Sequence, residues 1–356
     1  MYLGTENPFA GMMRFDSKHL PQALQRVLET LQGRADANET ALFARQLEYV
    51  FTQTYDILYP DLKARKLIPV NTQVPAGADS FTYAQFDKIG VAKIVHNYSQ
   101  DFPNADVVGK QFKQAIVSLG DSYQYTIQDM RAAALAGQPL ESRKAEAARY
   151  AMEVLLEKLA VSGDTGTGLL GLSNAPSIQA ITKVSQNNAG TTASTWKTLI
   201  TDALAKGNIT AVAQEIQKDV NAMQRAIFDN TKGVHMPDTL VLPTDAYSVL
   251  ATTPRAPGFT DDSLLDYILE VSPWLNQIDY WSRLDTAGAL VNGVHGRMMM
   301  YQKDPQVLSL IVSQDFEQFA PQARGMSMII PCHMRTGAVE VRYPLAVAFM
   351  DGVGGT

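Results

Sequence analysis

The stretch Pro139–Ser162 constrains the fold most, because it is the strongest helix signal in the chain. It reads PLESRKAEAARYAMEVLLEKLAVS and is dominated by Ala, Leu, Glu, Lys and Arg, which are strong helix formers. Pro139 suits the first turn, and Gly163 suits the left-handed position after the last turn. Apolar residues at three- and four-residue steps predict one buried stripe: Leu140, Ala148, Met152, Leu155 and Leu159. A helix about 36 Å long supports other elements, although an ordinary enzyme helix has the same pattern.

The polar side of this helix carries Arg149 and Glu153, which are four residues apart and predict an exposed ion pair. We expect this side to face the interior of an assembly or a neighbouring subunit. A buried charged side that no neighbouring subunit pairs would contradict the expectation.

Composition excludes several classes of protein. The 356 residues are 46% hydrophobic and 19% charged, which is typical of a soluble globular chain of one large or two ordinary domains. Lys and Arg total 30 against 36 Asp and Glu, so the net charge is −6, without the basic patch of a protein that grips nucleic acid. A protein that only surrounds a polyanion needs no such patch. No apolar run reaches the roughly 20 residues of a membrane span, and the N-terminus does not resemble a secretory signal.

Cys332 is the single cysteine, which excludes an intrachain disulfide framework and a multi-cysteine zinc site. This favours synthesis in a reducing, cytoplasmic environment. Cys332 lies in the apolar run MSMIIPCHM, where we expect a buried small hydrophobe and not a nucleophile.

A second distinctive segment, residues 70–100, is rich in β-forming residues. Gly90 separates two such runs, which predicts a long two-stranded arm. Apolar and polar residues do not alternate cleanly along it, so neither face is plainly a core face. Because an isolated hairpin is only marginally stable in water, the arm needs a surface to lie on, such as another subunit.

The rest of the chain predicts a mixture of helices and strands. Thr126–Ala136 reads as a short helix in which Thr126 and Asp129 are spaced as a capping box. The other expected helices are Ser17–Leu31, Asp36–Leu58, Thr195–Lys206, Thr210–Phe228, Ala246–Ala251 and Asp261–Val271. The expected strands are Thr239–Leu242, Arg297–Tyr301, Val307–Val312, Met326–Met334 and Ala338–Tyr343, with a turn at Thr336–Gly337 before the last.

A search for chemical motifs gives no constellation of catalytic residues. Gly166, Gly168 and Gly171 match G-x-G-x-x-G, but they follow a helix and lead into a turn, whereas the nucleotide fingerprint needs a strand before and a helix after. None of the five histidines stands at metal-ligand spacing, and no nucleophile elbow or Walker loop occurs. Residue types alone do not exclude a Ser-His-Asp triad. A folded chain with an extended arm and no chemical motif favours an assembly protein over an enzyme.

The order of these elements resembles the major capsid protein family of tailed bacteriophages, whose fold is shared with encapsulin shells and the herpesvirus capsid floor. Three sequence segments carry the resemblance: SYQYTIQDMRAAALAG, GDTGTGLLGLSNAP and RYPLAVAFMDGV. It implies an α+β fold with an N-terminal arm, an extended β loop (the E-loop), a long spine helix, a peripheral (P) domain and an axial (A) domain. The implied divisions are 1–60 for the arm and 61–125 for the E-loop (about 70–101) with its linker, then 126–231 for the P domain with spine helix 139–162. The A domain takes 232–325 and the return strands 326–356, while the placement of 177–231 stays open.

The resemblance also implies a function. Copies form hexamers and pentamers that tile an icosahedral head around double-stranded DNA, with scaffold, portal and decoration proteins as partners and without a cofactor or membrane. The location is the virion capsid, assembled in the cytoplasm of a bacterial host. The residues expected at contacts between subunits are Phe81, Tyr83, Phe86, Lys88, Lys93, Trp274 and Trp281. For the two lysines we expect ordinary ion pairs and not the covalent crosslink of some members. An encapsulin-like compartment and a hydrolase without a recognisable motif remain as alternatives.

Overall fold

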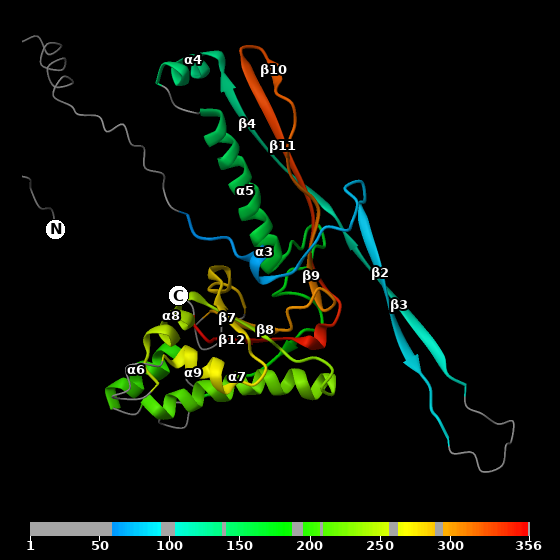
Figure 1. Cartoon of the computed structure of the whole chain (residues 1–356), viewed down its shortest axis with the longest axis vertical. Helices are drawn as coiled ribbons and strands as arrows, with labels where there is room; N and C mark the ends of the chain where they lie inside the picture. The colour runs from blue at the N-terminus through cyan, green and yellow to red at the C-terminus, as the bar shows by residue number, and fades with distance from the viewer. Residues whose placement is uncertain are drawn as a thin grey trace, which may run out of the picture. The chain divides into compact units, whose positions relative to one another are not determined.

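The computed structural model describes residues 59–93, 104–136, 140–186, 195–206, 209–255, 263–288 and 295–354, and the fold is that of Asp61–Thr356. The expected helices Ser17–Leu31 and Asp36–Leu58 lie outside the described residues. Within the described part, strands form two five-stranded sheets and a two-stranded hairpin (Figure 1). The chain therefore has the mixed α+β architecture expected from the sequence.

The first sheet is built around the long strand β11. Its order is β1–β9–β11–β10, with β4 paired to the other edge of β11. The strands are β1 (Val70–Asn71), β4 (Val117–Thr126), β9 (Leu308–Gln318), β10 (Gln322–Arg324) and β11 (Ser327–Val341). The predicted turn at Thr336–Gly337 is wrong, because β11 runs through it as one strand. What the sequence signalled there is an irregularity in the ladder, where Ala338 has a positive φ of 55°.

The helix predicted at 139–162 is confirmed as α5 (Leu140–Ser162), which packs on the first sheet (Figure 1). Gly163 follows it with φ +60°. The buried face includes Met152 and Leu156, whereas Leu155 is 41% exposed against 1% for Leu156. The predicted buried stripe is therefore wrong by one residue at this point. Leu156, four residues after Met152, lies on the buried face, whereas Leu155, three residues after it, does not.

Helix α4 (Ile127–Ala136) comes before α5, and its predicted capping box is confirmed. The Thr126 backbone amide donates to the Asp129 carboxylate at 3.0 Å, and the Asp129 amide donates to the Thr126 hydroxyl at 3.1 Å. These two bonds satisfy amides that the first turn of a helix leaves without intrahelical partners.

The second sheet has the order β5–β12–β8–β6–β7. Its strands are β5 (Gln179–Ala180), β6 (Thr239–Leu242), β7 (Gln277–Tyr280), β8 (Arg297–Tyr301) and β12 (Val347–Asp351). Both faces are buried. In β8, Met298 and Met300 pack with the helices of the second sheet, while Met299 and Tyr301 belong to the core of α5 and the first sheet. A strand covered on both sides reads as a continuous apolar run, which explains the sequence RMMMY.

Four helices pack on one face of the second sheet (Figure 1). They are α6 (Trp196–Lys206), α7 (Ile209–Thr231), α8 (Thr244–Thr252) and α9 (Leu264–Val271). The stripe of α7 is buried at Val212, Ile216, Val220, Met223 and Ile227. Helix α9 begins after its N-cap Ser263, and the predicted start at Asp261 and Asp262 lies outside the described residues.

The membership of strands in the two sheets differs from the expected division of the chain into consecutive segments. The segment 177–231, whose placement the sequence left open, supplies β5, α6 and α7 to the second sheet. Strand β12, expected with the return strands 326–356, also belongs to the second sheet, whereas β9, expected within 232–325, belongs to the first. The chain thus crosses between the sheets more often than the linear division implied.

Three short helical turns join these elements. They are α3 (Ala64–Leu67) and the 3-10 turns η2 (Ser282–Leu284) and η3 (Pro344–Ala346). Cys332 is 3% exposed in β11, which confirms its expected role as a small buried hydrophobe.

Candidate functional site

The expected β arm is a hairpin of two ten-residue strands, β2 (Ser80–Ile89) and β3 (Asp106–Ala115). They pair in antiparallel register from Ser80 opposite Ala115 to Ile89 opposite Asp106. The expected range 70–101 places the return strand too early, because the partner of β2 begins only at Asp106. Residues 94–103, which include part of the second β-rich run, lie outside the described residues.

The hairpin exposes an unusual number of apolar side chains. The exposed ones are Phe86, Ile89, Val91, Val107, Val108 and Phe112. Phe86 is 70% exposed although its ring lies on Gly109, where an added Cβ would be 2.9 Å from Phe86 Cε1. Tyr83 stacks on Phe112 across the strands, with ring centroids 5.2 Å apart. Such a surface is typical of a contact with another molecule.

The residues predicted at subunit contacts fall into two groups. Phe81 and Tyr83 are half-buried on one face of β2, Phe86 and Lys88 are exposed on the other, and Lys93 is exposed beyond the end of the strand. The first four of these residues therefore lie on one strand, two on each of its faces.

The two tryptophans lie elsewhere. Trp274 is half-buried and stacks on Phe228 at a centroid distance of 5.5 Å. Trp281 is 1% exposed within the chain itself, and its indole Nε1 donates to Glu157 of α5. Its side chain has no surface left for a neighbour, so the prediction for Trp281 is wrong and its role is core packing.

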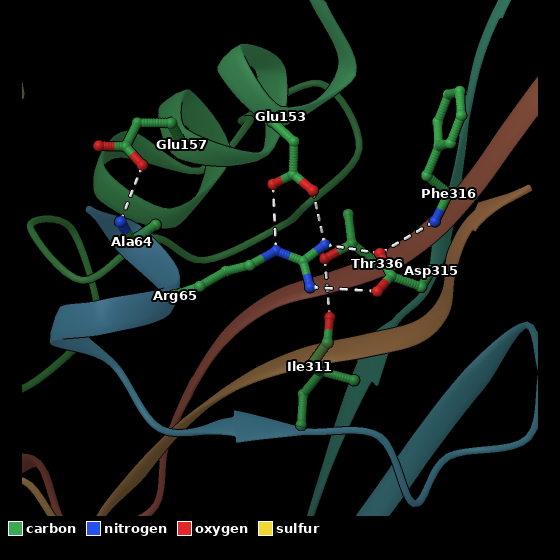
Figure 2. Close-up of polar contacts among 8 residues, drawn as sticks. All are labelled: Ala64, Arg65, Glu153, Glu157, Ile311, Asp315, Phe316 and Thr336. Atoms are coloured by element: carbon green, nitrogen blue, oxygen red, sulfur yellow. Dashed lines mark hydrogen bonds and ion pairs between the residues drawn. The ribbon is translucent and has the colours of Figure 1, made fainter. Parts of the chain in front are cut away.

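A cluster of ion pairs, which we call the α3 anchor, fixes the segment that leads into the hairpin (Figure 2). It consists of Arg65, Glu153 and Asp315. The Arg65 guanidinium donates to Glu153 of α5 at 2.9 and 3.0 Å and to Asp315 of β9 at 2.8 Å. Burial by itself would raise the pKa of the Asp315 carboxyl, but hydrogen bonds from the Arg65 side chain and the Phe316 amide lower it below its ordinary value.

Further contacts tie the same segment to α5 and to the second sheet. Glu157 of α5 is 3% exposed and accepts from the backbone amides of Lys63 at 3.1 Å and Ala64 at 2.8 Å. Lys63 Nζ donates to Asp279 of β7 at 2.6 Å. Burial opposes the ionised form of Asp279, but the hydrogen bonds from Lys63 and the Tyr280 amide outweigh it and lower the pKa of this carboxyl.

Sequence reasoning missed this anchor. Glu153 was assigned to an exposed pair with Arg149, whereas it binds Arg65, 88 positions earlier. On the polar side of α5, Glu157 is buried, and its three donors all come from its own chain. At this position the expectation that the polar side faces a neighbour or the interior of an assembly is therefore wrong. The sequence feature that could have indicated the anchor is the acidic Glu157, which directly follows the buried Leu156.

An open, apolar groove of about 320 Å³ lies beside the hairpin, where β2 faces the end of α7 and η3. It is lined by Gln85, Thr231, Val234, His235, Tyr343, Pro344 and Leu345. His235 Nδ1 lies 2.9 Å from Gln302 Oε1, and its ring lies 5.0 Å from that of Tyr343. The groove adds apolar surface to the same region of the molecule.

The described residues contain no group of three His, Cys, Asp or Glu side chains arranged to hold a metal ion. No helix in this part of the chain is both long and apolar enough to cross a lipid bilayer. Gly166, Gly168 and Gly171 lie in a turn without a following helix, in agreement with the rejected nucleotide fingerprint.

Comparison with known proteins assigns the family. The family model described as major capsid protein matches residues 90–353, which is more than half of the chain. The chain therefore belongs to the major capsid protein family, and its role is structural and not enzymatic. A comparison with curated protein sequences gives no significant match.

Solved capsids share the fold at low sequence identity. The capsid of Myoviridae phage XM1 matches with a TM-score of 0.68 and 16% identity, over 87% of this chain and 98% of that chain. A chain from Mycobacterium phage Ogopogo matches with a TM-score of 0.54 and 12% identity, over 86% and 97%. The capsid of a native GTA particle matches with a TM-score of 0.54 and 11% identity, over 87% and 95%. The fold is thus that of tailed-phage capsid proteins.

Proposed function

We propose that copies of this chain associate through hexamers and pentamers into an icosahedral phage head that encloses double-stranded DNA. In this assembly the β2–β3 hairpin is the E-loop and α5 is the spine helix. The first sheet belongs to the P domain, and the second sheet with α6, α7, α8 and α9 forms the A domain. The head is assembled in the cytoplasm of a bacterial host, with scaffold, portal and decoration proteins as partners.

The observation that carries the proposal is the exposed apolar surface of the hairpin. Two paired strands without a core of their own gain stability when they lie on a neighbour. A contact between unlike surfaces of identical subunits closes into a ring, and many modest contacts then add up. We propose that Phe81, Tyr83 and Phe86 pack against the neighbouring subunit. Lys88 and Lys93 form ion pairs at the edge of that contact, and Trp274 contributes at a separate one.

The test removes the hairpin beyond its root. Residues 82–113 are deleted and replaced by a short glycine linker, which leaves both sheets and both cores intact. We expect a folded chain that no longer forms closed particles in negative-stain images. A milder variant, Phe86→Ser, reduces particle yield, whereas Thr82→Ser on the same face of β2 does not.

Two outcomes would contradict the proposal. A deletion variant that still closes into shells excludes the hairpin as the assembly element. Particles from the native host that contain a protein cargo and no nucleic acid favour the encapsulin-like alternative. Extraction of nucleic acid from purified particles distinguishes the two shells.

A further inference from the structure

Strand β3 changes partner at a single residue, at the root of the hairpin. Up to Ala115 it pairs with β2, and from Val117 onward the chain pairs as β4 with β11. Ile116 lies between the two ladders, is 6% exposed and donates its amide to the Asp79 carbonyl at 3.0 Å. The β4–β11 ladder ends with Val117 opposite Thr336, inside the segment from His333 to Ala338 in which the pairing of β11 with β9 is irregular. The direction of the hairpin is therefore decided within very few residues.

The side chain of Gln114 bridges this point. Its amide Nε2 donates to the carbonyls of Gly337 at 2.6 Å and Val339 at 3.3 Å, which follow the end of the ladder on β11. Gln114 is only 8% exposed although its strand neighbours Gln111, Phe112 and Lys113 are exposed. Because buried carbonyls need a donor, the Gln114 amide takes the place of the backbone donor that β3 no longer offers.

The cross-strand partner of Gln114 reinforces the bridge. Phe81 lies opposite Gln114 in the hairpin, and its ring packs on Gly337, where an added Cβ would be 3.0 Å from Phe81 Cε1. The β11 segment that receives both side chains is held in turn by Thr336, whose hydroxyl donates to the Ile311 carbonyl at 2.7 Å (Figure 2). On the other limb of the root, Arg335 donates to Asp79 at 2.9 Å.

We propose that Gln114 is a positioning residue that fixes the direction in which the hairpin leaves the first sheet, and that this direction sets the uniformity of the assembled shell. The proposal rests on the proposed function, because the hairpin has to reach a neighbour. A ten-residue strand spans about 34 Å, so a swing of about 10° at the root displaces the tip by about 6 Å. That displacement exceeds the separation of roughly 4 Å at which apolar side chains touch, and closed rings repeat the error at every contact.

The variant that tests it is Gln114→Met, which nearly keeps the volume of the side chain and deletes both donors. Gln111→Met is the matched control, because Gln111 is on the same strand and exposed. Spin labels at Lys110→Cys in the hairpin and Lys158→Cys in α5, both at exposed positions, report the distance between arm and body. Labelled subunits are diluted with unlabelled ones, so that distances within one chain dominate.

We expect Gln114→Met to replace a narrow distance distribution by a broad one and to yield particles of mixed diameter or open sheets, with Tm lowered by only a few degrees. Gln111→Met keeps a narrow distribution and uniform particles. A distribution as narrow as that of the unmodified chain overturns the proposal, and so does a broad distribution with uniform shells.

Hydrogen exchange on the unmodified chain is a second test that needs no substitution in the core. The Ile116 amide should exchange its hydrogen as slowly as the amides of β4. If it exchanges as fast as the amides at the outer end of the hairpin, the proposal is overturned. Failure of the proposed function is distinguishable from failure of this inference. An unmodified chain that forms no shells refutes the former, while the distance and exchange measurements still decide on the anchoring by Gln114.

Discussion

At the scale of single residues, Glu157 connects three parts of the chain that are far apart in sequence. Its carboxylate accepts from the amides of Lys63 and Ala64 in the segment before the hairpin, and from the Trp281 indole after β7. The amides of Lys63 and Ala64 lie at the start of α3, where a helix has no internal acceptors to offer. A buried carboxylate in α5 thus satisfies donors that would otherwise be lost from water.

The first residue-scale prediction concerns Glu157→Ala. It leaves three buried donors without an acceptor, so we expect the free energy of unfolding to fall by about 3 kcal/mol or more. Glu157→Gln keeps one acceptor oxygen and should cost less. Glu146→Ala, at an exposed position of the same helix, should stay within about 0.5 kcal/mol of the unmodified chain. Urea unfolding of unassembled subunits measures all three, and an unchanged midpoint for Glu157→Ala would refute the role assigned to this carboxylate.

Two side chains of α5, Leu155 and Glu153, differ from expectation for the same physical reason. Leu155 and Leu156 are adjacent leucines, and helical periodicity accepts either one, whereas only the neighbouring sheet selects Leu156 for burial. The partner of Glu153 was chosen from its own helix, although the actual partner, Arg65, comes from a distant segment. Local spacing carries no information about such long-range partners.

At the scale of elements, the glycine-rich turn after α5 serves close packing and not phosphate binding. The Leu172 amide donates to the Ala160 carbonyl at 2.8 Å and the Ser173 amide donates to that of Val161 at 2.9 Å, so the turn satisfies carbonyls at the end of the helix. At Gly171 an added Cβ would lie 2.3 Å from the Gly163 amide nitrogen and 2.5 Å from the Val161 carbonyl oxygen. The backbone approaches itself too closely there for any side chain.

We predict that Gly171→Ala lowers the free energy of unfolding by roughly 2–4 kcal/mol, because rigid backbone and not a movable side chain obstructs the new methyl group. Gly166→Ala is the matched control from the same turn. Its nearest atoms are those of the Asp164 carboxylate at 3.6 Å, and its φ is not in the left-handed region. Thermal unfolding distinguishes the two variants. Equal losses would mean that the turn is sensitive to any substitution and that close packing at Gly171 is not the reason.

Elements with strong local signals were predicted well. Strands β6 and β8 have the predicted bounds, and the capping box at Thr126 starts α4 as expected. The hairpin was recognised by its composition, but its return strand was placed too early, since pairing register depends on contacts that the second run of β-forming residues does not specify. The turn predicted at Thr336–Gly337 failed for a related reason. Glycine occurs both in turns and at irregularities of a strand ladder. The sequence around Gly337 does not distinguish the two, because the contacts of Gly337 with Phe81 and Ile311 come from distant segments.

At the scale of the whole molecule, the sequence predicted the family and the order of the elements but not how they divide between the two cores. Strand β9, expected within 232–325, pairs in the first sheet, and β12, expected within 326–356, pairs in the second. The second sheet separates the two cores and is buried on both faces, so its strands lack the alternation that reveals which side they cover. Crossovers of this kind follow from packing that involves the entire chain.

The net charge of the molecule and the apolar surface of its hairpin together predict how assembly responds to salt. Copies that each carry a net charge of −6 repel one another, whereas the exposed side chains of Phe86, Ile89 and Phe112 on the proposed contact surface are apolar. Raising the ionic strength from 0.1 M to 1 M shortens the screening length from about 10 Å to about 3 Å, so we expect a larger fraction of assembled particles in light scattering. Sulfate should act more strongly than chloride at equal ionic strength, because it also strengthens apolar association. Phe86→Ser should reduce this additional effect of sulfate, and Thr82→Ser should not. Assembly that declines steadily with salt would instead indicate that ion pairs dominate the contacts between subunits.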